Sequence, residues 1–147
     1  DRCIEAGFLE KDCAGKLLPK NQQQGIPILG TVAAGFPAQE EQEDIERVTL
    51  DDLLIKKRGA TFLLRVKGES MRDEGIRSGD LVLVEKTNNI TPGDIIVASV
   101  DGEWTVKFFR KNKGKVYLEA ANPDYPSICA KEELLITLVV KAVIRKY

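Results

Sequence analysis

The sequence predicts a mainly β protein, folded as a partly closed β-barrel or twisted sandwich of short antiparallel strands. From Thr61 onward, short runs rich in β-branched and aromatic residues recur along the chain. Turn-forming residues such as Asp101-Gly102 separate these runs. At 147 residues the chain is also long enough for one compact domain with a buried core.

Residues 1–24 are expected to lie outside this domain. The stretch Ile4 to Leu9 suggests a helix end and a strand, but the segment is too short to bury a core. It runs into the polar stretch Pro19 to Gln24, which has the composition of a linker. We therefore place a boundary there, with residues 25–147 as the folded domain. Because the sequence begins with Asp1, we expect a fragment or a processed form of a longer protein.

Three features precede the predicted strands. Ile26 to Pro37 is apolar and expected to be extended, because its prolines disfavour helix in the residues before them. Gln39 to Asp44 carries four acidic residues and no basic one, which is typical of a solvated connector. Thr49 to Ile55 predicts one helical turn, capped by an aspartate and ended near Gly59.

Six strands are expected after this turn, each bounded by turn signals. The last of them is long and apolar, so it is either a further core strand or a strand that pairs with its twin in a symmetric dimer. The expected strands are Thr61 to Lys67, Leu81 to Glu85, Asp94 to Val100, Glu103 to Lys111, Lys115 to Ala120 and Leu134 to Arg145.

Composition narrows the classes of function. The 22 basic and 23 acidic residues nearly cancel, so the overall charge indicates neither a nucleic-acid binder nor a membrane binder. The three cysteines lack C-x-x-C spacing and no histidine is present, which favours reduced thiols over a zinc site. No apolar run approaches the roughly 20 residues that span a bilayer. We expect a cytoplasmic protein with no cofactor, no metal and no membrane contact.

Ser70 is the candidate nucleophile. It lies where an apolar strand runs into Gly68 and then into a serine at the mouth of a turn. A serine hydroxyl needs a nearby base to take its proton at neutral pH. Without histidine, the usual serine triad is excluded. The serine alone is a weak signal, because a serine at a helix start is normally a cap.

Lys107 is the candidate base. If Asp101-Gly102 forms a two-residue type I′ turn, Val100 pairs with Glu103 and Ile96 lies directly opposite Lys107. Burial among such apolar neighbours disfavours the ammonium ion and lowers the pKa from roughly 10.4 toward neutrality. A neutral lysine amine can then accept the serine proton.

The lysine assignment has alternatives. A hairpin lysine usually extends its amine to solvent at a sheet edge. Lys67 and Lys86 are the other candidate bases. Lys67 is too near Ser70 along an extended strand to approach it easily, and Lys86 sits at a strand end beside polar residues.

Ala33-Ala34-Gly35 is the candidate cleavage segment. Small residues are common in linkers and in tight packing. An extended segment of small residues is also what a protease cleft needs, because it lets the scissile carbonyl approach the nucleophile and the backbone donors.

These motifs follow one another in a set order: Ala33-Ala34-Gly35, Gly68-Glu69-Ser70-Met71-Arg72-Asp73-Glu74-Gly75-Ile76 with Gly79-Asp80-Leu81, and Glu103-Trp104-Thr105-Val106-Lys107. In order and spacing they resemble the self-cleaving domain of LexA-type repressors. The match runs from about Ile26 to Arg145. The resemblance implies a β-rich serine endopeptidase domain that cleaves its own chain with a Ser-Lys dyad.

The family resemblance also implies roles for particular residues and partners. It makes Ser70 the nucleophile, Lys107 the general base and Ala34-Gly35 the scissile bond, and we expect the backbone N–H groups of Glu69 and Ser70 to stabilise the oxyanion. It names the RecA filament on single-stranded DNA as the activating partner and implies a homodimer. Cleavage would relieve repression of the DNA-damage genes of the SOS response.

Two relatives of this family offer alternatives. Gly35-Phe36-Pro37 and Leu50 to Ile55 look more like UmuD, a self-processed accessory subunit of an error-prone DNA polymerase. Glu5 to Asp12 instead looks like the tail of a LexA winged helix-turn-helix, so we favour a repressor that contacts operator DNA through an N-terminal domain largely missing from this chain. A signal peptidase-like enzyme is disfavoured because no membrane anchor is seen.

Overall fold

The computed structural model of the chain describes residues 9–11, 17–19, 25–32, 34–35, 46–129 and 134–147. Two compact units are present, Asp1–Ile55 and Lys56–Tyr147. The domain boundary expected after residue 24 stays a prediction. The other predicted features that fall on residues 1–8, 12–16, 20–24, 33, 36–45 and 130–133 lie outside the described residues.

The first unit contains two short antiparallel pairs. Strand β1 (Leu9–Lys11) pairs with β2 (Leu17–Pro19), and β3 (Ile26–Ile28) pairs with β4 (Glu46–Val48). The extended run expected from Ile26 is shorter than predicted, because Ala34 and Gly35 form a bend. The expectation of one extended segment across the candidate cleavage bond is therefore wrong.

Helix α3 (Leu50–Leu54) confirms the predicted helical turn, with two corrections. Its N-cap is Thr49, whose Oγ1 accepts a hydrogen bond from the Asp52 N–H at 3.1 Å. The expected aspartate cap is wrong, because a capping oxygen must precede the first turn to reach its unpaired N–H groups. The helix also ends well before Gly59, since Ile55 is already extended.

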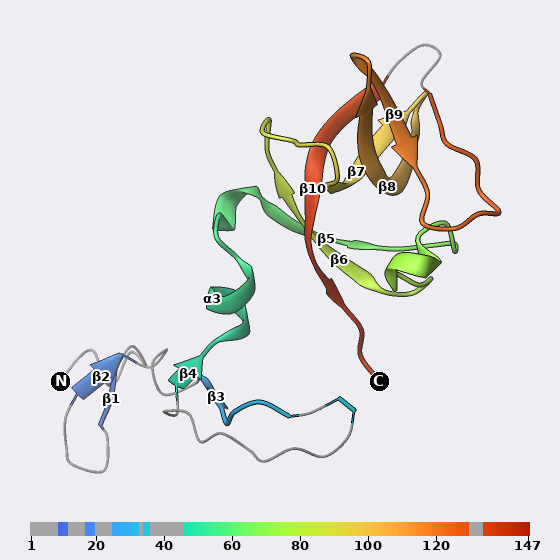
Figure 1. Ribbon diagram of the computed structural model, residues 1–147. Coiled ribbons are helices and arrows are strands. Elements are labelled where there is room, and N and C mark those ends of the chain that lie inside the picture. The colour runs from blue at the N-terminus through green and yellow to red at the C-terminus, as the bar shows by residue number, and fades with distance from the viewer. Residues whose placement is uncertain (1–8, 12–16, 20–24, 33, 36–45, 130–133) are drawn as a thin grey trace. The chain divides into compact units, whose positions relative to one another are not determined.

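The second unit is a six-stranded antiparallel sheet with the strand order β5-β6-β10-β7-β8-β9 (Figure 1). All six predicted strands are present, with ends that lie within one or two residues of those expected. The 3-10 turns η1 (Arg58–Ala60) and η2 (Arg72–Glu74) flank β5 and its following loop. The strands are β5 (Thr61–Arg65), β6 (Leu81–Lys86), β7 (Ile95–Val100), β8 (Glu103–Asn112), β9 (Lys115–Glu119) and β10 (Leu134–Ile144).

Strand β10 joins the two halves of this sheet. Its first half, Leu134 to Val139, pairs with β7, whereas Leu138 to Ile144 pairs with β6. The register shifts once against each partner, between Ile136 and Leu138 and between Val140 and Ala142. Such bulges bend a strand. The sheet is open, which agrees with the expected partly closed, mainly β fold.

Apolar side chains pack on both faces of the sheet. Val97 belongs to one cluster with Val82 and Val84, and its neighbour Ile96 belongs to a second cluster with Leu118. Neighbouring residues divide in this way because successive side chains of a strand point to opposite faces. Met71 and Ile76, which are 2% and 1% exposed, join the first cluster and so fix the loop after Ser70 on the sheet.

An ion pair fixes the end of β10 to the turn before β6. Asp80 is 4% exposed and accepts hydrogen bonds from Arg145 Nε at 2.8 Å and Nη2 at 2.6 Å. The Arg77 N–H donates to the same carboxylate at 2.8 Å. These bonds, chiefly those of Arg145, lower the pKa of Asp80 to about 2.

We expect Arg145→Met to lower the Tm at pH 7, because it leaves a buried carboxylate with one fewer charged partner. The folded-state pKa of Asp80 lies below its usual value of 3.8, so its stabilising effect exists above about pH 4 and fades toward pH 2. The Tm difference between wild type and variant should therefore shrink over that range. Thermal unfolding at pH 7 and pH 3 measures this difference, with Lys141→Met, which changes an exposed lysine, as the control. A Tm difference that is the same at both pH values would contradict the stabilising role of the Asp80–Arg145 ion pair.

Candidate active site

Ser70 and Lys107 lie together although 37 residues separate them in the sequence. The loop after β5 carries Ser70, and the middle of β8 carries Lys107. The Lys107 Nζ lies 2.7 Å from the Ser70 Oγ. This distance is within the range for direct proton transfer between a nucleophile and its base.

The hairpin register that places Lys107 is confirmed. Val100 pairs with Glu103 and Ile96 pairs with Lys107, as the two-residue turn requires. Asp101 and Gly102 have φ values of 49° and 89°, and positive φ at both positions is the mark of a type I′ turn. Lys107 is 4% exposed and faces fully buried Ile96 across the strands. Its amine is therefore held away from bulk water.

Burial lowers the pKa of Lys107 from its ordinary value of 10.5. Besides Ser70, the Nζ contacts the Thr105 Oγ1 at 2.7 Å and the Val106 carbonyl oxygen at 3.0 Å. Among the described residues, no carboxylate forms an ion pair with it. A neutral amine has two N–H donors and one lone pair. The Nζ lies in donor geometry to all three oxygens; in the neutral form, two N–H groups would serve Thr105 and Val106, and the lone pair would be left for the Ser70 hydroxyl.

The alternative bases are differently placed. Lys67 and Lys86 are both exposed, whereas Lys107 is buried. Of the three lysines considered, Lys107 is the one whose Nζ is hydrogen-bonded to Ser70.

The backbone beside Ser70 has two N–H groups without a hydrogen-bond acceptor among the described residues. Gly68 has a φ of 97°, a conformation that favours glycine and turns the chain into the loop. Within the described part of the chain, the N–H groups of Glu69 and Ser70 donate to no other group. Two free adjacent donors beside a nucleophile are typical of an oxyanion hole.

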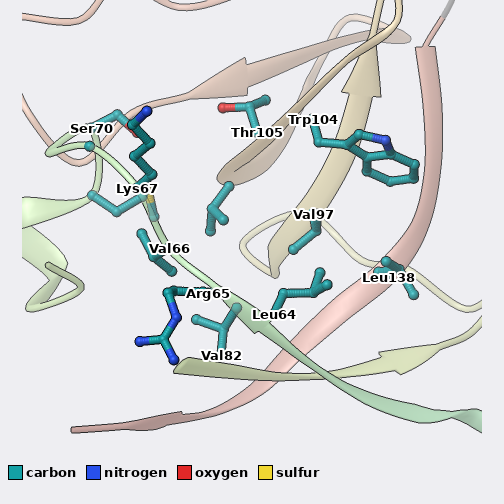
Figure 2. A pocket seen from close by; sticks show the side chains of 13 residues that line it. Leu64, Arg65, Val66, Lys67, Ser70, Val82, Val97, Trp104, Thr105 and Leu138 are labelled. Carbon is teal, nitrogen blue, oxygen red and sulfur yellow. The ribbon is translucent and has the colours of Figure 1, made fainter. Parts of the chain in front are cut away.

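An apolar cleft of about 420 Å³ adjoins Ser70. Figure 2 shows its side chains, with Ser70 on the loop that follows β5. Trp104 is 64% exposed and forms part of the wall. The cleft is lined mainly by Leu64, Val66, Met71, Val82, Val97, Trp104, Val106 and Leu138. Such a surface suits an apolar peptide segment.

The candidate scissile bond belongs to the first unit. Ala34 and Gly35 are exposed, and no described atom beyond Gly35 and its two chain neighbours lies within 4 Å of the position that a Gly35 side chain would occupy. Ala33 falls outside the described residues. The structure thus brings Ser70 and Lys107 together within one unit, and it leaves the approach of Ala34–Gly35 to them as a prediction.

Two polar residues of the site were not predicted from the sequence. Thr105 contacts the Lys107 amine. Side chains two residues apart on a strand point to the same face, so the position of Thr105 two residues before the lysine is a pattern that indicates this contact. Asn122 donates from Nδ2 to the Glu69 carbonyl oxygen at 2.9 Å. The sequence around Asn122 indicates only a turn.

Over the residues that the structure describes, no group of three or more histidine, cysteine or acidic side chains is placed to hold a metal ion. Cys129 has an exposed free thiol, whereas Cys3 and Cys13 lie outside the described ranges. In the described segments no helix is long and apolar enough to cross a bilayer.

An open antiparallel sheet that holds a buried lysine amine against a loop serine defines a mainly β protein with a Ser-Lys contact. The Peptidase S24-like family matches residues 27–143, and the chain belongs to this family.

Curated relatives agree with this assignment. The LexA repressor of Proteus mirabilis is 44% identical over 113 residues, covering 77% of this chain and 55% of the relative. That of Photorhabdus laumondii is 47% identical over 107 residues, covering 73% and 53%. That of Clostridium kluyveri is 36% identical over 150 aligned positions, covering 96% and 73%. The chain thus spans about half the length of the first two relatives.

Proposed function

We propose that this chain is the self-cleaving part of a LexA-like repressor of the SOS response, and that it cuts its own Ala34–Gly35 bond. The observation that carries the proposal is the 2.7 Å approach of a buried lysine amine, Lys107 Nζ, to the Ser70 hydroxyl. The named relatives are LexA repressors, which favours the repressor over the UmuD-like polymerase subunit.

The proposed reaction proceeds through an acyl-enzyme. Neutral Lys107 takes the Ser70 proton as Oγ attacks the Ala34 carbonyl carbon, and the Glu69 and Ser70 N–H groups stabilise the oxyanion. Protonated Lys107 then gives its proton to the Gly35 amine as the peptide bond breaks. Water, deprotonated by Lys107, hydrolyses the Ala34 ester and releases Ser70.

The substrate segment would act from within the same chain. Leu29 and Val32 are 76% and 82% exposed, and they supply apolar side chains that suit the cleft beside Ser70. Because the segment is tethered to the site, its effective concentration at Ser70 can be high. The protein therefore needs a way to prevent premature cleavage. We propose that residues 28–44 exchange between a docked and an undocked position. A RecA filament on single-stranded DNA would speed cleavage by binding the docked state better.

The quaternary proposal is a homodimer through β10. From Val140 to Ile144 this strand pairs with β6 along one edge, and no described strand pairs with its other edge. An unpaired edge can add the same strand of a second copy about a two-fold axis. In the whole repressor, a separate domain would contact operator DNA, and cleavage would separate it from this part.

We expect incubation of the purified chain at alkaline pH to yield two fragments, produced by cleavage between Ala34 and Gly35. Intact-mass measurement and N-terminal sequencing identify the bond, and the larger product should begin at Gly35. Activated RecA filaments should produce the same fragments at neutral pH. A product that begins elsewhere would move the scissile bond, and the absence of any cleavage under both conditions would refute self-cleavage.

A further inference from the structure

Asn122 holds the backbone of the loop that carries Ser70. It is 5% exposed, and its Nδ2 donates to the Glu69 carbonyl oxygen at 2.9 Å. Its Oδ1 accepts from the Asp124 N–H at 3.0 Å, so both ends of the amide are used. The bond therefore ties the loop to a turn 53 residues further along the chain.

The Glu69 carbonyl and the Ser70 N–H belong to the same peptide unit. That unit is planar and trans, so its C=O and N–H bonds point in opposite directions. A side chain that fixes the carbonyl therefore also fixes the direction of the N–H. The Arg72 N–H reaches the same carbonyl at a longer 3.2 Å, and Asn122 makes the shorter contact.

A second bond between the same two segments steadies this contact. The Asp73 N–H donates to the Ala121 carbonyl oxygen at 2.8 Å, three residues beyond Ser70. The loop is thus held on both sides of the serine. Among the described residues no hydrogen bond joins Asn122 to Lys107, whose Nζ contacts Ser70, Thr105 and Val106.

We propose that Asn122 is a positioning residue for self-cleavage, which acts by aiming the Ser70 N–H at the oxyanion. This inference rests on the proposed function of Ser70 and Lys107. Loss of the Nδ2 donor would loosen the peptide unit and weaken the oxyanion contact. It would leave the environment of the Lys107 amine, and hence the pH at which the amine becomes neutral, unchanged.

The test compares self-cleavage of five versions of the 147-residue chain from pH 7 to pH 11: wild type, Ser70→Ala, Asn122→Ala, Asn122→Asp and Asp124→Asn. Asn122→Asp keeps the Oδ1 acceptor and the side-chain shape but has an oxygen in place of the Nδ2 donor. It therefore still tests whether the donor is needed for a full maximal rate should Asn122→Ala fail to fold. Asp124→Asn is the matched control, because it alters an exposed side chain and keeps the backbone N–H that Asn122 uses. Circular dichroism establishes the folded fraction of each chain.

We expect the Asn122 variants that fold to show a maximal rate lowered about 10- to 100-fold, somewhat less than the ~10²–10³-fold cost of deleting an oxyanion donor. The midpoint of the pH profile of Asn122→Ala should stay at the wild-type value, whereas the new carboxylate of Asn122→Asp should move the midpoint of that variant upward. Asp124→Asn should cleave like wild type. A wild-type maximal rate in either folded Asn122 variant would overturn the proposal, as would a rate loss of Asn122→Ala that is explained wholly by a shifted midpoint. If wild type cleaves no faster than Ser70→Ala, the proposed function itself fails.

Discussion

Replacement of Ser70 by alanine is expected to abolish self-cleavage and to leave the fold intact. The hydroxyl oxygen, Oγ, is the atom that would form the acyl bond, and neither Lys107 nor the proposed oxyanion donors can replace it. Loss of a nucleophile that acts as a unit with its base costs at least ~10⁴-fold in rate. The half-buried side chain contributes little to the core, so the Tm should stay close to that of wild type.

The matched control for this variant is Ser127→Ala, which removes a hydroxyl from an exposed serine remote in sequence from the loop. Cleavage of both proteins at alkaline pH can be followed by intact mass over days. Fragments that accumulate at the wild-type rate in Ser70→Ala would remove Ser70 from the mechanism. Comparable slowing of Ser127→Ala would show that the loss is not specific to the nucleophile.

Lys107→Met should have an equally large effect on cleavage without lowering the stability of the fold. Methionine keeps an unbranched stem in the buried site but has no amine, so the rate should fall at least ~10⁴-fold. Replacement of a buried cationic group by an apolar one is often neutral or stabilising. We therefore expect an inactive protein whose Tm at neutral pH is equal to or above that of wild type.

Two further variants sharpen the lysine test. Lys107→Arg should also be inactive, because a guanidinium stays protonated and cannot act as a base. Lys111→Met changes an exposed lysine of the same strand β8 and should cleave normally. Measurable cleavage by Lys107→Met at more than a trace of the wild-type rate would show that another group takes the serine proton.

Local patterns were enough to predict much of this fold and the burial of Lys107, whereas the pairing of Lys107 with Ser70 rested also on the family resemblance. The six strands are bounded by turn residues whose preferences are local, and their ends fell close to those expected. The Asp101-Gly102 turn determined the register of the hairpin between β7 and β8. Counting five residue pairs from the turn, this register places Lys107 opposite Ile96. Burial of the lysine followed from that register, because directly opposed residues of a hairpin share a face.

Contacts between distant segments could not be predicted in this way. Asn122 reaches Glu69 across 53 residues, and the Asn-Pro pair that contains it indicates only a turn. The division of β10 between β6 and β7 depends on two bulges, which arise from the packing of the whole sheet and not from the strand's own pattern. The bend at Ala34 and Gly35 likewise departs from the extended chain that the flanking prolines favoured.

The central claim is that a neutral Lys107 activates Ser70, and the pH dependence of the self-cleavage rate tests it most directly. Burial lowers the folded-state pKa of Lys107 below 10.5, so the unfolded chain binds more protons between these two pKa values and the folded state gains stability as pH rises. Below the folded-state pKa the neutral fraction, and with it the rate, should rise about tenfold per pH unit.

The rate should then level off at a pH below the ordinary lysine value of 10.5, while the protein remains folded. First-order rates measured by intact mass from pH 6 to pH 11, with circular dichroism on the same samples, provide the profile. We predict a rise followed by a plateau in wild type and no measurable rate in Lys107→Met. A rate that is flat from neutral to alkaline pH would contradict a lysine base.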